Sequence, residues 1–199
     1  MKTKEKIIIS AKEIFHKKGF AGARMQEIAD ASGVNKALLH YHFKSKDVLF
    51  RAVLLAGVAE IFPLIMSTLN GPKPLREKII SVVELYINQI AQNPQLPGFV
   101  LNELTQNPNF IQDNLQGMVS KPTLFISQME EAIRQGEILP TDPIQLIASI
   151  IGLCVFPFIG KPMIQFISGK NEKEFQQFIV DRKAHIEALL LNGLFCKNN

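Results

Sequence analysis

The sequence predicts an all-α protein. Apolar residues recur at steps of three and four along most of the 199 residues, which is typical of amphipathic helices. No segment of strand length alternates between apolar and polar residues, and no internal repeat is present. Glycine and proline clusters separate the periodic segments. We therefore expect about nine helices, arranged as a small N-terminal domain over residues 1–50 and a larger helical domain over residues 51–199.

The composition indicates a soluble globular protein with a basic N-terminal end. Hydrophobic residues make up 47% of the chain and charged residues 20%, which is ordinary for such proteins. Ten Lys and Arg residues stand against five Asp and Glu residues up to Phe50, whereas the remainder is nearly balanced. A basic end on a neutral body suits a polyanion, because Lys and Arg displace counterions from phosphates. On charge alone, a solvated basic face would be the simpler interpretation.

The apolar run from Leu146 to Gly160 predicts a buried helix and not a membrane span. It is shorter than the ~20 residues that a span requires, and it contains Pro157. The N-terminal residues are too charged for a signal peptide, and neither cysteine has a Cys or His at metal-ligand spacing. We expect a cytoplasmic protein with reduced thiols, no bound metal and no cofactor.

The first two helices are predicted over residues 4–18 and 24–31. The first has an apolar stripe at helical spacing and ends at Gly19, which is a typical C-cap residue. The second begins without the Ser, Thr, Asp or Asn residue that normally caps a helix, and Gly22 is the best substitute. We therefore expect a weakly capped second helix.

A very short third helix follows the Gly33 turn, with Asn35 as its predicted cap. Leu39 and Phe43 are one turn apart and should face inward. Two short helices joined by a glycine turn, the second with a polar and basic outer face, form the helix-turn-helix pattern. A helical hairpin without a functional role is the alternative. The outer face is predicted to carry Lys36, Ala37, His40, Tyr41 and Lys44.

Six further helices are predicted after this motif. Ser45 should cap a helix that extends toward Leu69 and is kinked or broken by Pro63. Asp142 before Pro143 is a strong helix start, as is the capping-box pair of Asn171 and Glu174 that opens the last helix. The remaining predicted helices are 75–92, 99–105, 110–135 with a bend at Gly117 or Pro122, 143–158 and 172–192.

Enzymatic interpretations lack the necessary residues. His40 and His42 are two apart on a helix, so they point to different sides and cannot share a metal ion. Glu130 and Glu131 are better explained as a solvated corner than as a catalytic pair. The sequence has no glycine-rich phosphate loop and no nucleophile motif. We therefore expect a protein that is not an enzyme.

The end of the third predicted helix carries the pattern Tyr-x-Phe-x-Ser-Lys-x-x-Leu, from Tyr41 to Leu49. Together with the upstream residues, this register resembles the N-terminal domain of the TetR (tetracycline-repressor-like) family of bacterial regulators. The resemblance covers residues 4–49, about the first quarter of the chain. The matching residues are Ala11, Phe15, Gly19, Phe20, Glu27, Ile28, Ala29, Ala31, Gly33, Val34, Leu39, Tyr41, Phe43, Ser45, Lys46 and Leu49.

This resemblance implies a DNA operator as partner, read by the third helix in the major groove. It implies a phosphate contact for Lys46 and a backbone or base contact for residues 24–26. The family usually has Thr or Ser near positions 23–25, whereas this chain has Ala, Arg and Met there. His40 replaces the usual aromatic residue before Tyr41. The predicted DNA-binding set is Arg24, Gln26, Asn35, Lys36, Ala37, His40, Tyr41, Lys44 and Lys46.

The resemblance also implies a homodimer built from the last two helices. The helix from Pro143 is apolar nearly all round, so it should be buried on more than one side. A dimer would place two recognition helices on half-sites roughly 34–36 Å apart. A central helix of a monomer core is the alternative. The predicted dimerisation residues are Ile147, Ile150, Ile151, Cys154, Phe178, Ile186, Leu189 and Leu190.

An apolar effector cavity is predicted in the second domain, among the fourth to eighth helices. The alternative is that its Phe and Met residues are ordinary core residues. The combined prediction is a repressor released from its operator by a small, largely apolar ligand. A helical small-molecule carrier with weak or non-specific DNA binding is the alternative function. The predicted ligand-binding residues are Phe62, Met66, Phe99, Asn102, Glu103, Phe125, Gln128, Met129 and Phe158.

Overall fold

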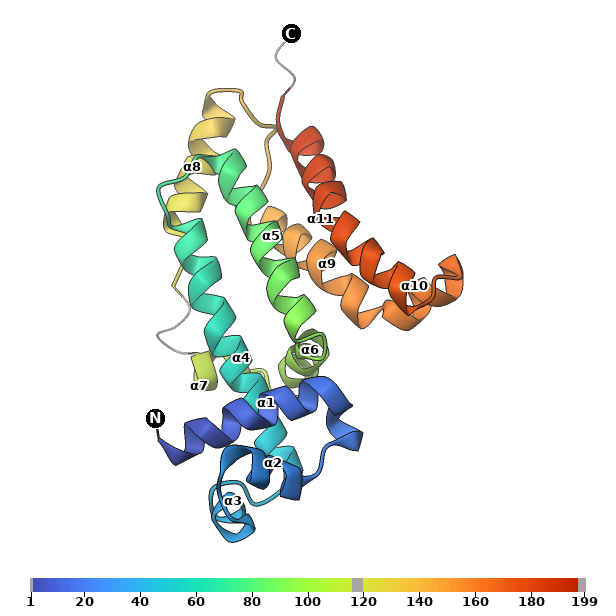
Figure 1. Cartoon of the computed structure of the whole chain (residues 1–199). Helices are drawn as coiled ribbons and strands as arrows, with labels where there is room; N and C mark the ends of the chain where they lie inside the picture. The colour runs from blue at the N-terminus through green and yellow to red at the C-terminus, as the bar shows by residue number, and fades with distance from the viewer. Residues whose placement is uncertain (1, 116–119, 197–199) are drawn as a thin grey trace. The chain divides into compact units, whose positions relative to one another are not determined.

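The computed structural model describes residues 2–115 and 120–196, and within these residues it contains eleven α-helices (Figure 1). A single isolated bridge joins Ile138 to Phe195. The predicted all-α class is therefore confirmed. The chain divides into two compact units, Met1–Glu60 and Ile61–Asn199. The domain limits of 1–50 and 51–199 stay an expectation, and the first unit as observed extends further, into the fourth helix.

The first unit contains α1 (Thr3–Gly22), α2 (Met25–Ser32), α3 (Lys36–His42) and the first part of α4 (Lys46–Leu69). Helical geometry in α1 is interrupted at Gly19, whose φ of 67° and ψ of 177° turn the chain where the sequence predicted an end. The first unit has a single apolar core. Its buried members are Ile7, Ala11, Phe15, Ala23, Ile28, Ala29, Leu39, Phe43, Leu49 and Val53.

Helix α4 continues through Pro63 to Leu69, so the predicted break does not occur. Pro63 is exposed, and water can therefore satisfy the carbonyl oxygen that the missing proline N–H leaves unpaired. By length and composition α4 could also cross a membrane. Its apolar residues Val58, Ile61 and Ile65 are buried within the fold, and 39% of its most apolar stretch is buried.

The second unit continues with α5 (Leu75–Gln92), whose limits match the prediction. The next helix, α6 (Leu96–Gln106), begins before the predicted start because its proline lies in the first turn, where no intrahelical N–H is required. The single helix predicted over 110–135 is wrong. The structure has α7 (Phe110–Leu115) and α8 (Thr123–Arg134), with Pro122 as the N-cap residue of α8. The predicted bend at Gly117 lies outside the described residues.

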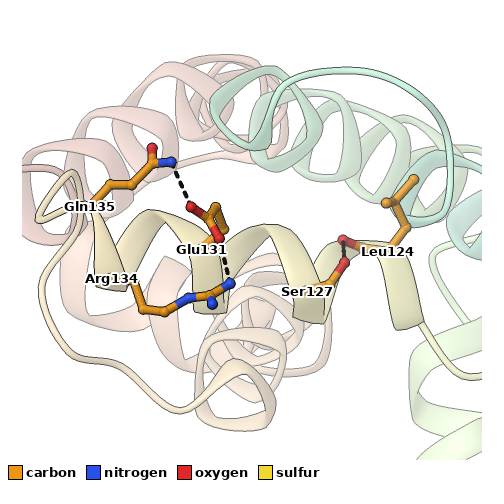
Figure 2. A network of polar contacts seen from close by, with 5 residues as sticks. All are labelled: Leu124, Ser127, Glu131, Arg134 and Gln135. Carbon is orange, nitrogen blue, oxygen red and sulfur yellow. Dashed lines mark hydrogen bonds and ion pairs between the residues drawn. The ribbon is translucent and has the colours of Figure 1, made fainter.

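Two exposed polar side chains of α8, Ser127 and Glu131, make hydrogen bonds within the helix and to its C-cap residue (Figure 2). The Ser127 hydroxyl donates to the Leu124 carbonyl oxygen at 3.0 Å. The Glu131 carboxylate accepts from Arg134 and, at 2.6 Å, from the Gln135 amide. This carboxylate therefore stabilises the last turn of α8, in agreement with its interpretation as a surface residue.

The end of the chain folds as α9 (Pro143–Ile159), α10 (Lys161–Ser168) and α11 (Glu172–Leu194). Asp142 caps α9 by accepting from the next two free backbone N–H groups, and the predicted capping box opens α11. Helix α10 was not predicted. It follows α9 after a bend of 72°, and its proline lies in its first turn. Helix α5 packs against α8, α9 and α11 and is thus central to the second unit.

Candidate nucleic-acid interface and apolar cavity

Helix α3 is fixed at its start by two local features. Gly33 adopts the left-handed conformation with φ of 67°, and its N–H donates to the last carbonyl oxygens of α2. The Asn35 side chain then accepts from the Leu38 N–H at 2.8 Å, as predicted for the cap. Because both contacts are made by backbone and cap atoms, the direction of α3 is set independently of its outer side chains.

The two faces of α3 differ completely in exposure. Leu39 is fully buried and Phe43 is 2% exposed, so the helix is anchored to the core from below. The Tyr41 side chain, by contrast, is 80% exposed. A row of side chains, polar or basic except for Ala37, is thus presented to solvent by α3 and the residues just after it, with little packing to constrain it. Its exposed members are Lys36, Ala37, His40, Tyr41 and Lys44.

Helix α2 begins without side-chain capping. Arg24 is the N-cap residue and makes no side-chain hydrogen bond to the helix, so Gly22 does not have the capping role suggested for it. The Gln26 amide instead donates to Asp30 at 2.8 Å within α2. The Lys18 amine binds Glu27 at 2.9 Å, joining α1 to α2, and this hydrogen bond holds the pKa of Glu27 below its usual value.

Lys46 lies at the start of α4 and is half-buried. Its amine donates to the carbonyl oxygens of Phe20 at 2.9 Å and Ala23 at 3.3 Å, and Ala21 accepts at 3.5 Å. The same nitrogen lies 4.5 Å from the centroid of the Phe20 ring. Lys46 is thus held against backbone 23 to 26 residues away in the sequence, a contact that no local sequence pattern signals.

The second unit contains a cavity of about 80 Å³ between α4, α5 and α9. Phe62 and Met66, two of the residues predicted to bind a ligand, are among the residues that line it. Tyr86 also lines it, and burial raises the pKa of its hydroxyl to about 12. Its sequence signal was its place on the inward stripe of α5. The full lining is Phe62, Ile65, Met66, Leu69, Val82, Tyr86, Ile147, Ile150 and Ile151.

Other residues predicted to bind the ligand lie outside this lining. Phe125 and Met129 are fully buried in the core, and the Phe99 ring packs edge-on against Phe110 with centroids 6.2 Å apart. The Gln128 amide nitrogen donates to the carbonyl oxygen of Lys73 at 3.2 Å. The exposure of the remaining three differs from one to the next: Asn102 is exposed, Phe158 half-buried and Glu103 buried.

The residues predicted for dimerisation separate into three groups by exposure. Four of them are buried within a single chain, and two others, Ile147 and Phe178, are half-buried. Ile151 and Leu189 are exposed, at 39% and 52%, and remain available to a second chain. Burial also raises the pKa of the Cys154 thiol to about 12. The buried group consists of Ile150, Cys154, Ile186 and Leu190.

Comparison with known proteins connects this geometry to a family. Residues 7–53, which contain the helix-turn-helix, match the family model described as bacterial regulatory proteins, tetR family. Over 96% of its length the chain is 28% identical to the Bacillus subtilis protein named "Probable HTH-type transcriptional regulator YttP", of which it covers 95%. The chain belongs to the TetR family. This TetR-family protein is therefore a DNA-binding transcriptional regulator and not an enzyme.

Two further similarities extend this result. Over 45% of its length the TetR-family chain is 34% identical to the Mycolicibacterium smegmatis protein named HTH-type transcriptional activator FasR, of which it covers 41%. A solved TetR/AcrR-family regulator from Thermobifida fusca has the same fold, with a TM-score of 0.68 and 21% identity. That match covers 96% of this chain and 97% of the other. The likeness in fold thus includes the second unit as well as the helix-turn-helix.

Proposed function

We propose that this TetR-family protein is a homodimeric repressor that a small, largely apolar effector releases from its operator. The observation that carries the proposal is the two-faced α3. Its buried side anchors it, and its exposed side presents polar groups that match base edges and phosphates. The runner-up is a small-molecule carrier with weak or non-specific DNA binding. The uncapped start of α2, where Arg24 replaces a hydroxyl residue, is the feature that favours this alternative.

Each exposed side chain of the motif has a chemical role in the proposal. His40 and Tyr41 can donate and accept hydrogen bonds at base edges, and Ala37 can contact a thymine methyl group. Lys36 and Lys44 would neutralise phosphates. A second set would contact the backbone from α2 and its neighbourhood. That set comprises Arg24, Gln26 and the amide nitrogen of Asn35.

A homodimer would supply the second half-site. The exposed apolar residues Ile151 of α9 and Leu189 of α11 support pairing through these two helices, since an exposed aliphatic side chain gains by burial against a partner. The buried Cys154 and Ile186 would support the same helices from inside the chain.

The cavity supports the effector part of the proposal. Its lining is almost entirely apolar, and its volume is several times the ~10–15 Å³ that holds one water molecule. Helix α4 begins at Lys46, beside α3 in sequence, and supplies Phe62, Met66 and Leu69 to the lining. An effector would therefore contact the helix that continues from the DNA-binding motif. Relief of DNA binding by tenfold to a hundredfold requires about 1.4–2.8 kcal/mol of coupling.

DNA binding is tested with the promoter fragment next to the protein's own gene and a scrambled fragment of equal length. We expect preference for the promoter fragment at every salt concentration. His40→Ala should change the preferred base at one or two positions, whereas Lys44→Ala should weaken all sequences and reduce the salt slope by about one. Weak binding to both fragments without preference would support the carrier and refute the regulator proposal. Measurement of transcription from that promoter in vitro, with and without the protein, distinguishes repression from activation. Activation is the function in the name of the Mycolicibacterium relative.

The effector is tested by thermal stabilisation of the protein with a panel of small apolar compounds. Val82→Phe should abolish stabilisation by any compound that binds the cavity, because the larger ring fills part of its volume. A compound that stabilises the wild type but not this variant should also release the promoter fragment. If it stabilises both proteins equally, the cavity is not the effector site.

A further inference from the structure

The link between α1 and α2 lacks the groups that usually complete helix ends. Helical geometry in α1 is interrupted at Gly19 and resumes for one short turn to Gly22, and the last carbonyl oxygens of a helix have no partner within it. Helix α2 starts at Arg24 without a side-chain hydrogen bond. The last turn of α1 and its C-cap residue Ala23, residues 20–23, therefore form an α1–α2 link that joins one open helix end to another, and contacts from outside this segment are needed to fix its path.

The Lys46 ammonium occupies this position. It has three N–H donors, and the carbonyl oxygens of Phe20, Ala21 and Ala23 surround it at 2.9, 3.5 and 3.3 Å. Its positive charge also offsets the partial negative charge at the C-terminal end of α1. Ala23 is 3% exposed, so its carbonyl oxygen would lose a partner that water cannot easily replace.

An aromatic contact reinforces the same attachment. The Phe20 ring lies beneath the Lys46 nitrogen, 4.5 Å from it, and against the Phe50 ring with centroids 5.0 Å apart. Lys46 and Phe50 are one helical turn apart and share a face of α4. The first turns of α4 thus contact the Phe20 ring through the Lys46 ammonium and the Phe50 ring. Phe15 of α1 packs against both aromatic rings.

We propose that Lys46 is a positioning residue, which fastens the α1–α2 link to α4 and thereby sets where the α2–α3 motif begins. The three N–H donors of the ammonium are directed at carbonyl oxygens of the chain itself. A phosphate contact would therefore break at least one of these hydrogen bonds. The family resemblance assigns the Lys46 charge to a contact with a DNA phosphate, whereas in this protein the same charge binds the carbonyl oxygens of the α1–α2 link. Lys44, which is exposed two residues earlier, is the residue of this segment that meets the phosphate.

The test compares Lys46→Met with Lys44→Met in the full-length protein. Two quantities are measured: the melting temperature of the DNA-free protein, and the slope of log Kd against log salt concentration for promoter DNA. Lys46→Met should lower the melting temperature of the first unit by about 5–10 °C and weaken binding without changing the salt slope. Lys44→Met should leave the melting temperature unchanged and reduce the slope by about 0.9.

Lys46→Arg separates the two roles if Lys46→Met does not fold. An arginine keeps the charge, but its planar fork cannot direct three donors from one atom at three carbonyl oxygens. We expect Lys46→Arg to lower the melting temperature, whereas a phosphate contact would be preserved by arginine. An unchanged melting temperature in Lys46→Met together with a slope reduced by about one would overturn the proposal.

The proposal rests on DNA binding by α3, yet its failure can be told from the failure of the proposed function. If the wild type shows no sequence preference, the proposed operator function fails. The melting temperatures and the salt slope on non-specific DNA still decide the role of Lys46. If the wild type prefers the promoter fragment but Lys46→Met and Lys44→Met behave alike in both measurements, the positioning role alone is refuted.

Discussion

Replacement of Gly19 by alanine should destabilise the first unit more than the same change at Gly33. Both glycines have φ of 67°, a value that costs an L-residue roughly 1–2 kcal/mol. They differ in ψ, which is 27° at Gly33 and 177° at Gly19. The first value belongs to the left-handed helical region, which other residues can visit. The second belongs to a region that is essentially restricted to glycine.

The magnitude follows from the backbone alone at Gly33, since an added Cβ there would meet no atom within 4 Å. We expect about 1 kcal/mol for Gly33→Ala and about 2–3 kcal/mol for Gly19→Ala. The loss of freedom in the unfolded chain is the same for both changes, so it cancels in the comparison. The difference of about 1–2 kcal/mol corresponds to roughly a 5- to 30-fold difference in the population of the opened state.

Hydrogen exchange of the full-length protein, measured by mass spectrometry on peptides from α1 to α3, reports this opening directly. Asparagine supplies the control, because it tolerates the left-handed helical region. Gly33→Asn should recover most of the stability lost in Gly33→Ala, whereas Gly19→Asn should recover none. Equal exchange rates in the two alanine variants, or recovery by asparagine at both positions, would refute the backbone argument.

Three further predictions concern the second unit. Lys78→Met should raise the stability by about 1–3 kcal/mol, because the Lys78 amine is fully buried without a hydrogen-bond partner among the described residues. Burial lowers the pKa of Lys78, so the buried charge destabilises the folded wild type at neutral pH. The difference in unfolding free energy between Lys78→Met and the wild type, measured with urea, should therefore shrink as the pH rises toward 10.5. Iodoacetamide should label Cys196 in the native protein but not Cys154, which is buried and has its pKa raised to about 12, so mass spectrometry should find one label. Asp142→Ala removes the acceptor of two backbone N–H groups, at 2.7 and 3.0 Å, and should lower the unfolding midpoint by the equivalent of about 1 kcal/mol.

Local signals predicted much of this fold because they act over a few residues. The caps at Asn35, Asp142 and Asn171 were visible in the sequence, and each is formed by atoms two or three residues apart. Prolines were more ambiguous. A proline lies harmlessly in the first turn of α6 and of α10, and Pro63, which was expected to kink or break α4, lies in the exposed interior of that helix.

The site required information that local patterns do not carry. The apolar stripe of α9 showed that Ile150 and Cys154 would be buried, but the stripe cannot say whether the covering atoms belong to the same chain. In the structure both are buried within one chain. The sequence pattern from Tyr41 to Leu49 placed Lys46 near the start of the fourth helix. Its carbonyl partners lie 23 to 26 residues away in the sequence and depend on the tertiary fold. Tyr86 lies at helical spacing from the apolar residues of α5, yet the cavity that it faces is formed by three helices together.

The complete separation of the two faces of α3 has a consequence for how this protein can change its target. Leu39 and Phe43 hold the helix, and the exposed Ala37, His40 and Tyr41 contribute little to that hold. A gene library randomised at these three codons should therefore yield mostly folded proteins. Variants that recognise new operators can then be selected without compensating changes elsewhere, and the same freedom would let duplicated copies of such a gene diverge in target while keeping one scaffold.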